Sequence, residues 1–371
     1  MSQRENVNPI REQNHRKNSR RYQKRAAARR RRTIFIMEIV LLLILAVVLF
    51  FVSKLSKIEK TKLDMDKIEV NEDISQESRK IMKGYQTIAM FGLDNRSNGN
   101  LSQGRSDVIM LANINNDTKE VKLVSVYRDT YLDTGDGIFQ KCNAAYAKGG
   151  PEQAISMLNV NLDLNITDYV TVDFNSIIEC VDLLGGVDME ITDDEASLMT
   201  GYIRELNELT GNKAENLTQG GTYTLNGVQA CAYARIRYGG GDDYRKTERQ
   251  RTVLTAMVKK AQQSDLTTVN KLINEVCGDI QTSFSNAELL ALASQVFQYS
   301  IGDTTGFPFT KTTRVLSKKT GDVVIPCDLS DNVKELHIFL YEDSAYTASD
   351  TVKQNSEKIV SDTGFKSGDG H

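Results

Sequence analysis

Histidine is scarce in this chain, and its scarcity excludes whole classes of chemistry. The three histidines are His15, His337 and His371, so one lies near the start of the chain and one is its last residue. A catalytic triad that uses histidine as its base needs this residue fixed in a folded domain, and a histidine-rich metal site needs several. The sequence therefore argues against both kinds of site.

Cysteine and proline are also sparse. The five cysteines stand singly, with no CxxC pair, which excludes the usual ligand spacing of a zinc site. Three of them lie in apolar stretches typical of buried thiols, and the other two are the candidate disulfide pair. The three in apolar stretches are Cys142, Cys180 and Cys231, and the candidate pair is Cys277 with Cys327. The four prolines and 25 glycines form no repeat, which excludes a fibrous or low-complexity chain.

The net charge of −3 over 371 residues is the sum of two oppositely charged parts. Residues 1–32 hold twelve Lys or Arg and two acidic residues, a balance of +10, so the rest of the chain sums to −13. Residues 33–52 follow, an apolar run whose only ionisable side chain is Glu38. Twenty such residues are enough to cross a hydrocarbon core of roughly 30 Å as a helix. The basic block before this run places the N-terminus in the cytoplasm and the rest of the chain outside.

A cleaved signal peptide is the alternative to this membrane anchor. The long basic region, the length of the apolar run and the absence of a small-residue cleavage site all disfavour it. The basic tail carries no interleaved aromatic residues. We therefore expect it to set the topology at an anionic membrane, and we expect no binding of nucleic acid.

Composition divides the chain into six segments. The stalk is charged and low in aromatic residues, and the final segment is polar and poor in apolar side chains, which favours disorder. The segments are a basic cytoplasmic tail (1–32), a transmembrane helix (33–53), an extracellular stalk (54–84), a main folded domain (85–300), a C-terminal extension (301–345) and a disordered tail (346–371).

Strands and helices alternate through the main domain. Buried strands are expected at residues 86–93, 107–114, 121–126, 169–173 and 187–192. Helices are expected from residue 151, at 174–184, at 193–211 on an exposed face, at 225–237 and at 246–263. The alternation predicts an α/β fold in which helices flank a central, mostly buried β-sheet. In the extension, residues 313–317, 322–329 and 335–341 are expected as edge strands or a docked addition.

Two carboxylates stand beside the ends of neighbouring expected strands. Asp94 directly follows the first strand and Asp107 begins the second. Carboxylates at adjacent strand ends can converge on one hard cation such as Mg²⁺, which completes its coordination shell with phosphate oxygens and water. Taken alone, two loop acids that bind nothing are the commoner explanation.

Basic residues gather in two places of this otherwise acidic domain. Arg128 follows the third strand, and a second group lies within residues 235–251. Guanidinium groups match phosphate geometry and keep their proton, so they suit a pyrophosphate clamp. A basic helix face paired with the domain's own acids is the alternative. The second group consists of Arg235, Arg237, Arg245, Lys246, Arg249 and Arg251.

Seven segments, in order over roughly residues 85–265, resemble the LytR-CpsA-Psr family of cell-wall phosphotransferases. They are FGLDNR, GRSDVIMLANI, VYRDTY, KCNAAYAKGG, YVTVDFNSIIECVDLLGGVDMEI, LNGVQACAYARIRY and DDYRKTERQR. The resemblance implies a membrane-anchored enzyme that takes a glycopolymer from a polyprenyl-pyrophosphate carrier. It would join the polymer through phosphate to a hydroxyl of peptidoglycan, outside a Gram-positive-type membrane. The polymer, whether teichoic acid, capsule or another glycan, is left open.

The resemblance also implies residue roles. Asp94 and Asp107 would bind Mg²⁺ or Mn²⁺, and either Asp94 or Asp243 would accept the proton of the attacking hydroxyl. In the family, the acid at position 243 and the aromatic residue after it are followed by Gly and then Arg. This chain has Arg245 and then Lys246 there, and either could take the arginine's place. The implied catalytic set is Asp94, Arg128, Arg235, Arg237 and Asp243. The implied pyrophosphate contacts are Arg105, Arg128, Arg235, Arg237, Arg245, Lys246 and Arg249.

Two other functions stay open. A lipid-pyrophosphate hydrolase would use the same clamp, because water can replace the sugar hydroxyl. A non-catalytic wall-polymer-binding or regulatory membrane protein is the third possibility, and the intact set of acids and arginines argues against it. The apolar helix at 174–184 could line a groove for the polyprenyl chain, with ordinary core packing as its alternative.

Overall fold

We describe the protein from a computed structural model. The structure describes residues 59–60, 63–93, 101, 104–237, 243–265, 268, 272 and 280–370. The predicted cytoplasmic tail, the predicted transmembrane helix and Asp94 lie outside these ranges. Within them, no helix has both the length and the hydropathy of a membrane span.

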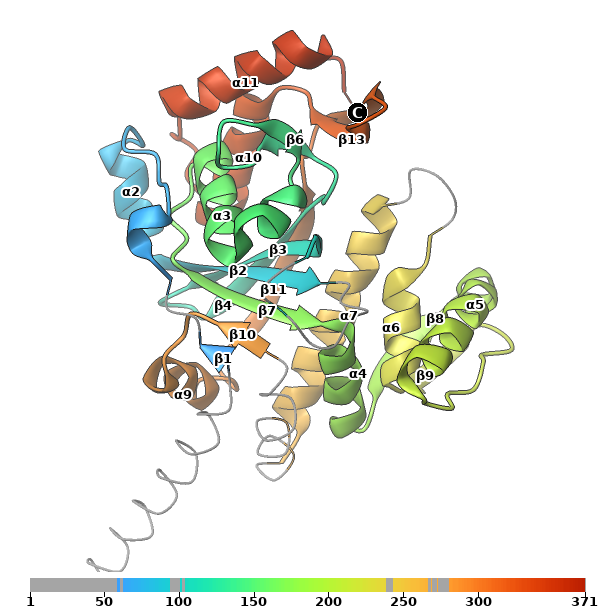
Figure 1. Cartoon of the computed structure of the whole chain (residues 1–371). Coiled ribbons are helices and arrows are strands. Elements are labelled where there is room, and N and C mark those ends of the chain that lie inside the picture. The colour runs from blue at the N-terminus through green and yellow to red at the C-terminus, as the bar shows by residue number, and fades with distance from the viewer. Residues whose placement is uncertain are drawn as a thin grey trace, which may run out of the picture. The chain divides into compact units, whose positions relative to one another are not determined.

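A seven-stranded mixed sheet forms the centre of the fold (Figure 1). β2, β3 and β4 form an antiparallel meander, β7 runs parallel to β2, and β11 runs parallel to β4. The strands predicted at 86–93, 107–114, 121–126 and 169–173 are therefore confirmed, and they are adjacent. In sheet order the strands are β1 (Glu59–Lys60), β10 (Ile280–Thr282), β7 (Asp168–Asp173), β2 (Tyr85–Leu93), β3 (Ser106–Asn115), β4 (Glu120–Val126) and β11 (Ser300–Phe307).

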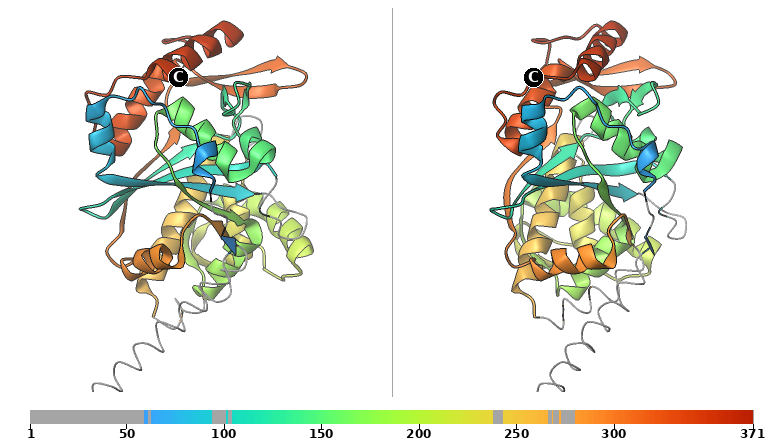
Figure 2. Two further views of the ribbon diagram at one scale, coloured as in Figure 1. Left: turned by 60° about the vertical axis from the view of Figure 1, so that its left-hand side comes forward. Right: turned by 90° about the vertical axis from the view of Figure 1, so that its left-hand side faces the viewer.

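Helices cover one face of this sheet and bury its apolar side chains (Figure 2). Phe91, Leu111 and Val124 from the strands lie in the same core as Leu158 and Leu336 from the helices. The helices are α2 (Gln76–Met82), α3 (Ala144–Leu162), which kinks at its two glycines before Pro151, α10 (Leu329–Tyr341) and α11 (Asp350–Thr363). The predicted central, mostly buried sheet flanked by helices is confirmed.

The opposite face of the sheet packs against α4 (Phe174–Leu183), α7 (Asp243–Gln263) and α9 (Asn286–Ser294). Met110 and Leu123 from the strands lie in a smaller core with Phe284 and the partly buried Leu254 and Leu289. These helices matter for function because α4 and α7 begin at the sheet edge where the predicted site residues lie.

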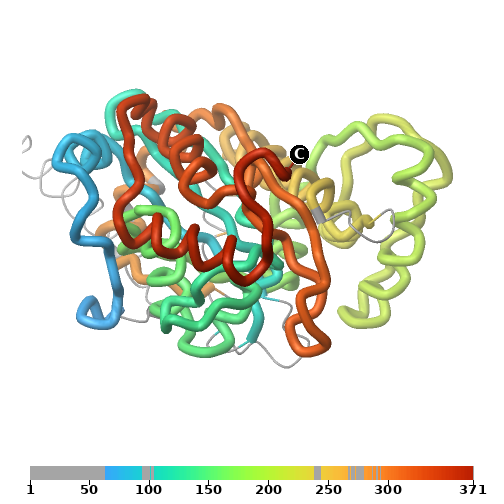
Figure 3. The backbone as a smooth tube through the Cα atoms, turned by 90° about the horizontal axis from the view of Figure 1, so that it is seen from above, coloured from blue at the N-terminus to red at the C-terminus, as the bar shows by residue number. Residues whose placement is uncertain are grey.

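A second lobe extends from α4 and α7, to the right in Figure 3. It contains α5 (Asp193–Thr210), α6 (Gly227–Arg235) and the hairpin of β8 (Val187–Ile191) with β9 (Gly221–Leu225). Capping boxes start α5 at Thr192 and α6 at Asn226. The prediction that α5 is exposed is wrong for one face, because Met199 and Ile203 are buried in the core of this lobe. The predicted strand at 187–192 pairs only with β9 among the described strands.

The predicted stalk is wrong for residues 63–84. Ile68, Ile74 and Met82 are buried in the first core, and the Asn71 side chain donates to the Val160 carbonyl at 3.1 Å. A short 3-10 helix, η1 (Met65–Lys67), precedes them. A few apolar side chains between charged ones are enough to attach this segment to the domain, so the composition was misleading.

The predicted disordered tail is also wrong. Ser349 caps α11, which buries Val352 and Ile359 against the first core, and Tyr346 lies in the same core. Residues 335–341, expected as a strand, are the second half of α10 because Asp328 caps a helix there. The extension therefore belongs to the main domain, because β11 extends the central sheet. The predicted strands at 313–317 and 322–329 lie in or next to a hairpin of β12 (Lys311–Ser317) with β13 (Gly321–Pro326). A further short hairpin pairs β5 (Tyr131–Asp133) with β6 (Phe139–Lys141).

Candidate active site

The ends of three strands meet at one edge of the central sheet. Leu93, the last residue of β2, is the register partner of Ser106 on β3 and of Asp173 on β7. Asp107 follows Ser106 and thus lies at this edge, beside the point where the chain continues into Asp94. Asp173 was not predicted as a site residue, because in the sequence this acid is only the last residue of an expected strand.

Arg128 and Asp107 form an ion pair at this edge. Arg128 Nη1 donates to Asp107 Oδ1 at 2.7 Å, and Arg128 Nε lies 3.8 Å from Asp129 Oδ2. Lys141 Nζ lies 3.1 Å from the other oxygen of Asp129. The Arg128 side chain is 22% exposed, so the guanidinium is held by carboxylates while still accessible to a ligand. Two residues that the sequence analysis assigned to the site are therefore in direct contact.

Asp107 is the one described member of the predicted metal-binding pair. Among the described residues no three Asp, Glu, His or Cys side chains lie close enough together to hold a metal ion. Mg²⁺ commonly uses only one or two protein carboxylates and fills its other positions with phosphate oxygens and water. A part-buried carboxylate at a phosphate site fits that chemistry, although here Arg128 already binds one of its oxygens.

Arg235 is oriented by aromatic rings and one acid. It is the last residue of α6, and its Nη2 lies 3.1 Å from Glu205 Oε1 on α5. Its guanidinium carbon lies 5.6 Å from the ring centre of Phe174 and 5.7 Å from that of Tyr202. Phe174 directly follows the end of β7, so these contacts bring Arg235 towards the sheet edge that carries Asp107.

The other predicted clamp residues are spread over different environments. Arg237 is part-buried just after α6, Arg105 and Arg245 are exposed, and Lys246 is buried near the start of α7. Asp243 begins α7, and its side chain lies outside the described residues. These positions leave open whether Arg245 or Lys246 replaces the family's arginine.

Arg249 lies inside the second lobe. Its Nε lies 3.1 Å from Glu195 Oε1 on α5, and its Nη1 donates to the Ile236 carbonyl at 3.4 Å. Both charged side chains are nearly buried. The structure therefore connects Arg249 to α5 and to the end of α6, and the contact of Arg249 with pyrophosphate stays a prediction.

An aromatic contact joins the end of β4 to the start of α7. The rings of Tyr127 and Tyr244 have centroids 4.6 Å apart, and Lys311 Nζ lies 5.4 Å and 4.8 Å from these two centroids. Burial lowers the pKa of Lys311. Lys311 was not predicted as a site residue, because no local pattern connects it to Tyr127 and Tyr244, which lie far earlier in the sequence.

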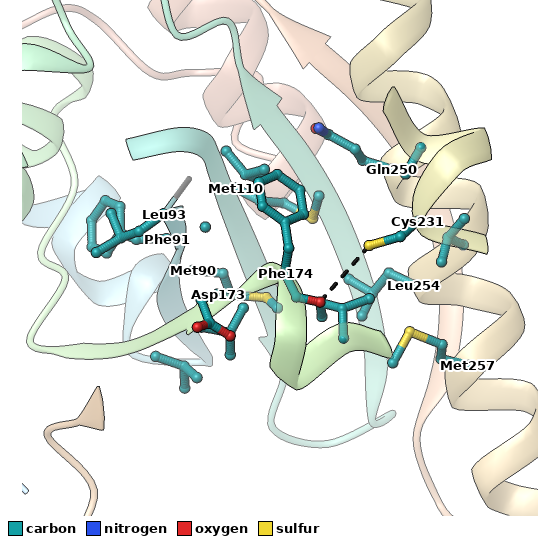
Figure 4. A pocket seen from close by; sticks show the side chains of 17 residues that line it. Met90, Phe91, Leu93, Met110, Asp173, Phe174, Cys231, Gln250, Leu254 and Met257 are labelled. Carbon is teal, nitrogen blue, oxygen red and sulfur yellow. Dashed lines mark hydrogen bonds between the residues drawn. The ribbon is translucent and has the colours of Figure 1, made fainter. Parts of the chain in front are cut away.

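We call the sheet edge that carries Asp107 and Arg128 the polar edge. An apolar cavity of about 110 Å³ adjoins it, between the sheet and α4, α6 and α7 (Figure 4). Phe174 and Ile177 from the predicted lipid-groove segment line it, whereas Ile178 of the same helix packs in the second lobe. The Cys231 thiol also faces the cavity, and burial raises its pKa to about 12, so it is neutral.

Gln250 is an unexpected polar residue on the cavity wall. Its side chain is drawn beside Cys231 and Leu254 in Figure 4. Its Oε1 atom is buried and has no hydrogen-bond partner among the described residues. Buried acceptors are normally satisfied, so this amide is suited to receive a donor from a ligand.

Sequence comparisons place the chain among known proteins. A model of the LytR_cpsA_psr family matches residues 45–314. The chain is 30% identical over 210 residues to polyisoprenyl-teichoic acid–peptidoglycan teichoic acid transferase TagU of Enterococcus faecalis, which covers 56% of this chain and 64% of that protein. It is 29% identical to the corresponding TagV of Bacillus subtilis, covering 51% and 48%. Biofilm regulatory protein A of Streptococcus mutans is 30% identical, covering 53% and 49%. The match thus spans about half to two thirds of the length of these relatives.

Solved structures show the same fold. The crystal structure of B. subtilis TagV superposes with a TM-score of 0.53 at 25% identity, covering 70% of this chain and 98% of that one. The structure titled "TagT bound to LIIa-WTA" gives a TM-score of 0.54 at 18% identity, covering 82% and 99%. The central sheet with its flanking helices is thus shared with these proteins.

Proposed function

Because the chain belongs to the LytR_cpsA_psr family, we propose that it transfers a glycopolymer from a polyprenyl-pyrophosphate carrier to a hydroxyl of peptidoglycan, forming a phosphodiester. Relatives named teichoic acid transferases support this choice. The Arg128–Asp107 ion pair next to an apolar cavity is the observation that carries the proposal, since a lipid pyrophosphate needs both a charged and an apolar site.

The polar edge has the groups that phosphoryl transfer requires. The reaction depends mainly on positioning the phosphate and on stabilising charge on its oxygens. Arg128 and Arg235 are each held by an acid and are part-buried, so their donors are pre-oriented. An incoming pyrophosphate would accept hydrogen bonds from these guanidinium groups. Either Asp94 or Asp243 would accept the proton of the attacking hydroxyl.

A divalent cation belongs to this proposal. Asp107, together with Asp94, would hold Mg²⁺ or Mn²⁺ at the phosphate. When bound, the metal would supply positive charge to the phosphate oxygens. Asp107 would then share its carboxylate between the cation and Arg128.

The apolar cavity is proposed to receive the first part of the prenyl chain. Its volume of about 110 Å³ is well below the roughly 300–1,000 Å³ of pockets that hold drug-sized ligands. A long lipid would therefore extend beyond the cavity, or widen it by moving α4 or α7 away from the sheet. The lining of Met90, Val108 and Leu254 would tolerate such movement, because apolar contacts are not directional.

The proposed location of the enzyme rests on the sequence. We propose a single membrane-spanning anchor at residues 33–53, with the N-terminus in the cytoplasm and the catalytic domain outside. The relatives favour teichoic acid as the polymer, and capsule or another wall glycan would use the same chemistry.

Reconstitution tests the reaction. The full-length protein in detergent would be incubated with a labelled, lipid-linked pyrophosphate glycopolymer, peptidoglycan fragments and Mg²⁺. We expect label covalently joined to peptidoglycan, lost in Arg128→Gln and retained in the matched control Arg204→Gln, an exposed arginine on α5. Release of soluble polymer phosphate at the same rate without peptidoglycan would instead identify a hydrolase. Absence of both products would contradict an enzymatic function.

A further inference from the structure

A second pocket lies between α7 and β11, with a volume of about 440 Å³, and we call it the α7–β11 pocket. The apolar cavity is lined from α7 by Gln250, Val253 and Met257. The α7–β11 pocket is lined from the same helix by Arg251 and Thr255. Because each helical residue advances by about 100°, these two sets lie on opposite faces of α7. The pocket is therefore separate from the candidate lipid groove.

An irregularity in β11 shapes this pocket. The pairing of β11 with β4 shifts register between Ile301 and Thr304, and both of these residues and Gly302 line the pocket. Such bulges leave backbone groups outside the sheet ladder, where they can bind other partners. A Cβ atom at Gly302 would lie 2.2 Å from Glu120 Oε1, so a larger residue there would displace the Glu120 side chain.

Positive charge dominates the wall of the pocket. α7 contributes Arg251, Lys259 and Lys260, and β8 contributes Asp188. Asp188 Oδ2 lies 3.7 Å from Lys260 Nζ, and a hydrogen bond from Thr224 together with the charge of Lys260 lowers its pKa. Three cations thus line the pocket with one acid, in a part of the chain whose total charge is strongly negative.

Arg251 is the buried member of this group. The residue is 7% exposed, and its Nε and Nη1 atoms have no hydrogen-bond partner among the described residues. Burial lowers the pKa of Arg251, an effect opposed by Tyr127 and Glu248. Buried, unsatisfied donors on a charged group are unfavourable unless a ligand completes them. Arg251 lines the pocket, so an anion there would be attracted by the charge of its guanidinium.

We propose that the α7–β11 pocket binds a phosphate ester, with its phosphate group at Arg251 and between Lys259 and Lys260. Phosphate offers several acceptor oxygens and a charge of about −1 to −2, which matches these donors. The volume also admits a glycerol- or sugar-sized group beside the phosphate. The proposal does not depend on the transfer reaction. A wall-polymer phosphodiester and a phospholipid head group share this chemistry.

Binding to the full-length protein in maltoside micelles tests the proposal in two arms. The soluble arm titrates inorganic phosphate, glycerol 3-phosphate and an oligomer of glycerol phosphate by calorimetry. The lipid arm counts bound phosphatidylglycerol by native mass spectrometry, with diacylglycerol as the control without phosphate. The test variant is Lys259→Gln with Lys260→Gln. The matched control is Lys318→Gln with Lys319→Gln, two exposed lysines in the turn between β12 and β13.

We expect binding in at least one arm, weakened at least tenfold in the test variant and unchanged in the control. The arm that responds identifies the source of the phosphate. Arg251→Lys should also weaken binding, because it keeps the charge but removes the planar set of donors. If this variant fails to fold, the comparison of the Lys259→Gln/Lys260→Gln variant with its control still decides. No binding in either arm, or an equal loss in both double variants, would overturn the proposal.

Discussion

Arg249 on α7 donates from Nη1 to the backbone carbonyl of Ile236, the residue that separates Arg235 from Arg237. This contact is long, at 3.4 Å, and it accompanies the shorter ion pair of Arg249 with Glu195. The segment 235–237, which carries the two predicted clamp arginines, is therefore attached to α7. We expect Arg249 to act as a positioning residue for this segment.

Replacing Arg249 by Met should lower the free energy of unfolding by about 3–5 kcal/mol, because it leaves the nearly buried Glu195 carboxylate without its cationic partner. Adding Glu195→Gln, which removes the buried charge but keeps a side-chain oxygen for the capping box at Thr192, should recover much of this loss. Urea denaturation of the two variants and the wild type measures both effects. Wild-type stability in Arg249→Met would contradict a buried ion pair.

Filling the apolar cavity should separate lipid binding from phosphate binding. Ala234 lines the cavity next to Arg235, and Ala234→Leu would occupy part of its volume. We expect at least tenfold weaker binding of undecaprenyl pyrophosphate and unchanged binding of inorganic pyrophosphate, measured by calorimetry. An equal loss for both ligands would indicate damage to the polar edge instead.

His337 should make stability depend on pH. Its ring stacks on Tyr346 with centroids 3.8 Å apart, and its Nδ1 is buried with no partner among the described residues. Burial lowers the pKa of His337 from 6.5, so the folded state favours the neutral ring. Its contribution is complete above pH 6.5 and is lost as the pH falls through the lower, folded-state pKa.

The melting temperature at pH 7.5 and at pH 5.5 checks this expectation. Wild type should lose more stability on acidification than His337→Gln, in which no ring can be protonated. Identical pH dependence in the two proteins would mean that His337 does not contribute.

Lys311 should stabilise the start of α7 through the rings of Tyr127 and Tyr244. Lys311→Met keeps most of the apolar stem but removes the cation. We expect a loss of about 0.5–2 kcal/mol in unfolding free energy and faster amide exchange at residues 244–248. Unchanged exchange there would contradict the contact.

Much of the fold was predictable because short-range patterns agree with it. The strands at 107–114 and 121–126 are joined by a short connection, and the helix expected at 225–237 begins at a capping box of Asn226 and Gln229. The strand prediction for residues 335–341 was wrong because a short apolar run fits a strand or a helix equally well. The prediction of a disordered tail was wrong because Val352 and Ile359 attach α11 to a core formed by distant residues.

The site was predictable where strand ends determine it. Asp107 and Arg128 meet because β3 and β4 are antiparallel neighbours, which the sequence already indicated. The partners of the other arginines were not predictable. Glu205 and Glu195 lie on α5, and the packing of that helix depends on tertiary contacts without a local sequence signal.

The central claim is that Arg128 and Arg235 bind pyrophosphate. The most direct test compares Arg128→Gln and Arg235→Gln with the wild type in undecaprenyl-pyrophosphate binding, transfer rate and melting temperature. The account predicts a loss of about 2–4 kcal/mol in transition-state stabilisation for each, with melting temperatures close to that of Arg204→Gln. Unchanged lipid-pyrophosphate binding together with a large drop in melting temperature would contradict it, because the arginines would then serve only their ion pairs with Asp107 and Glu205.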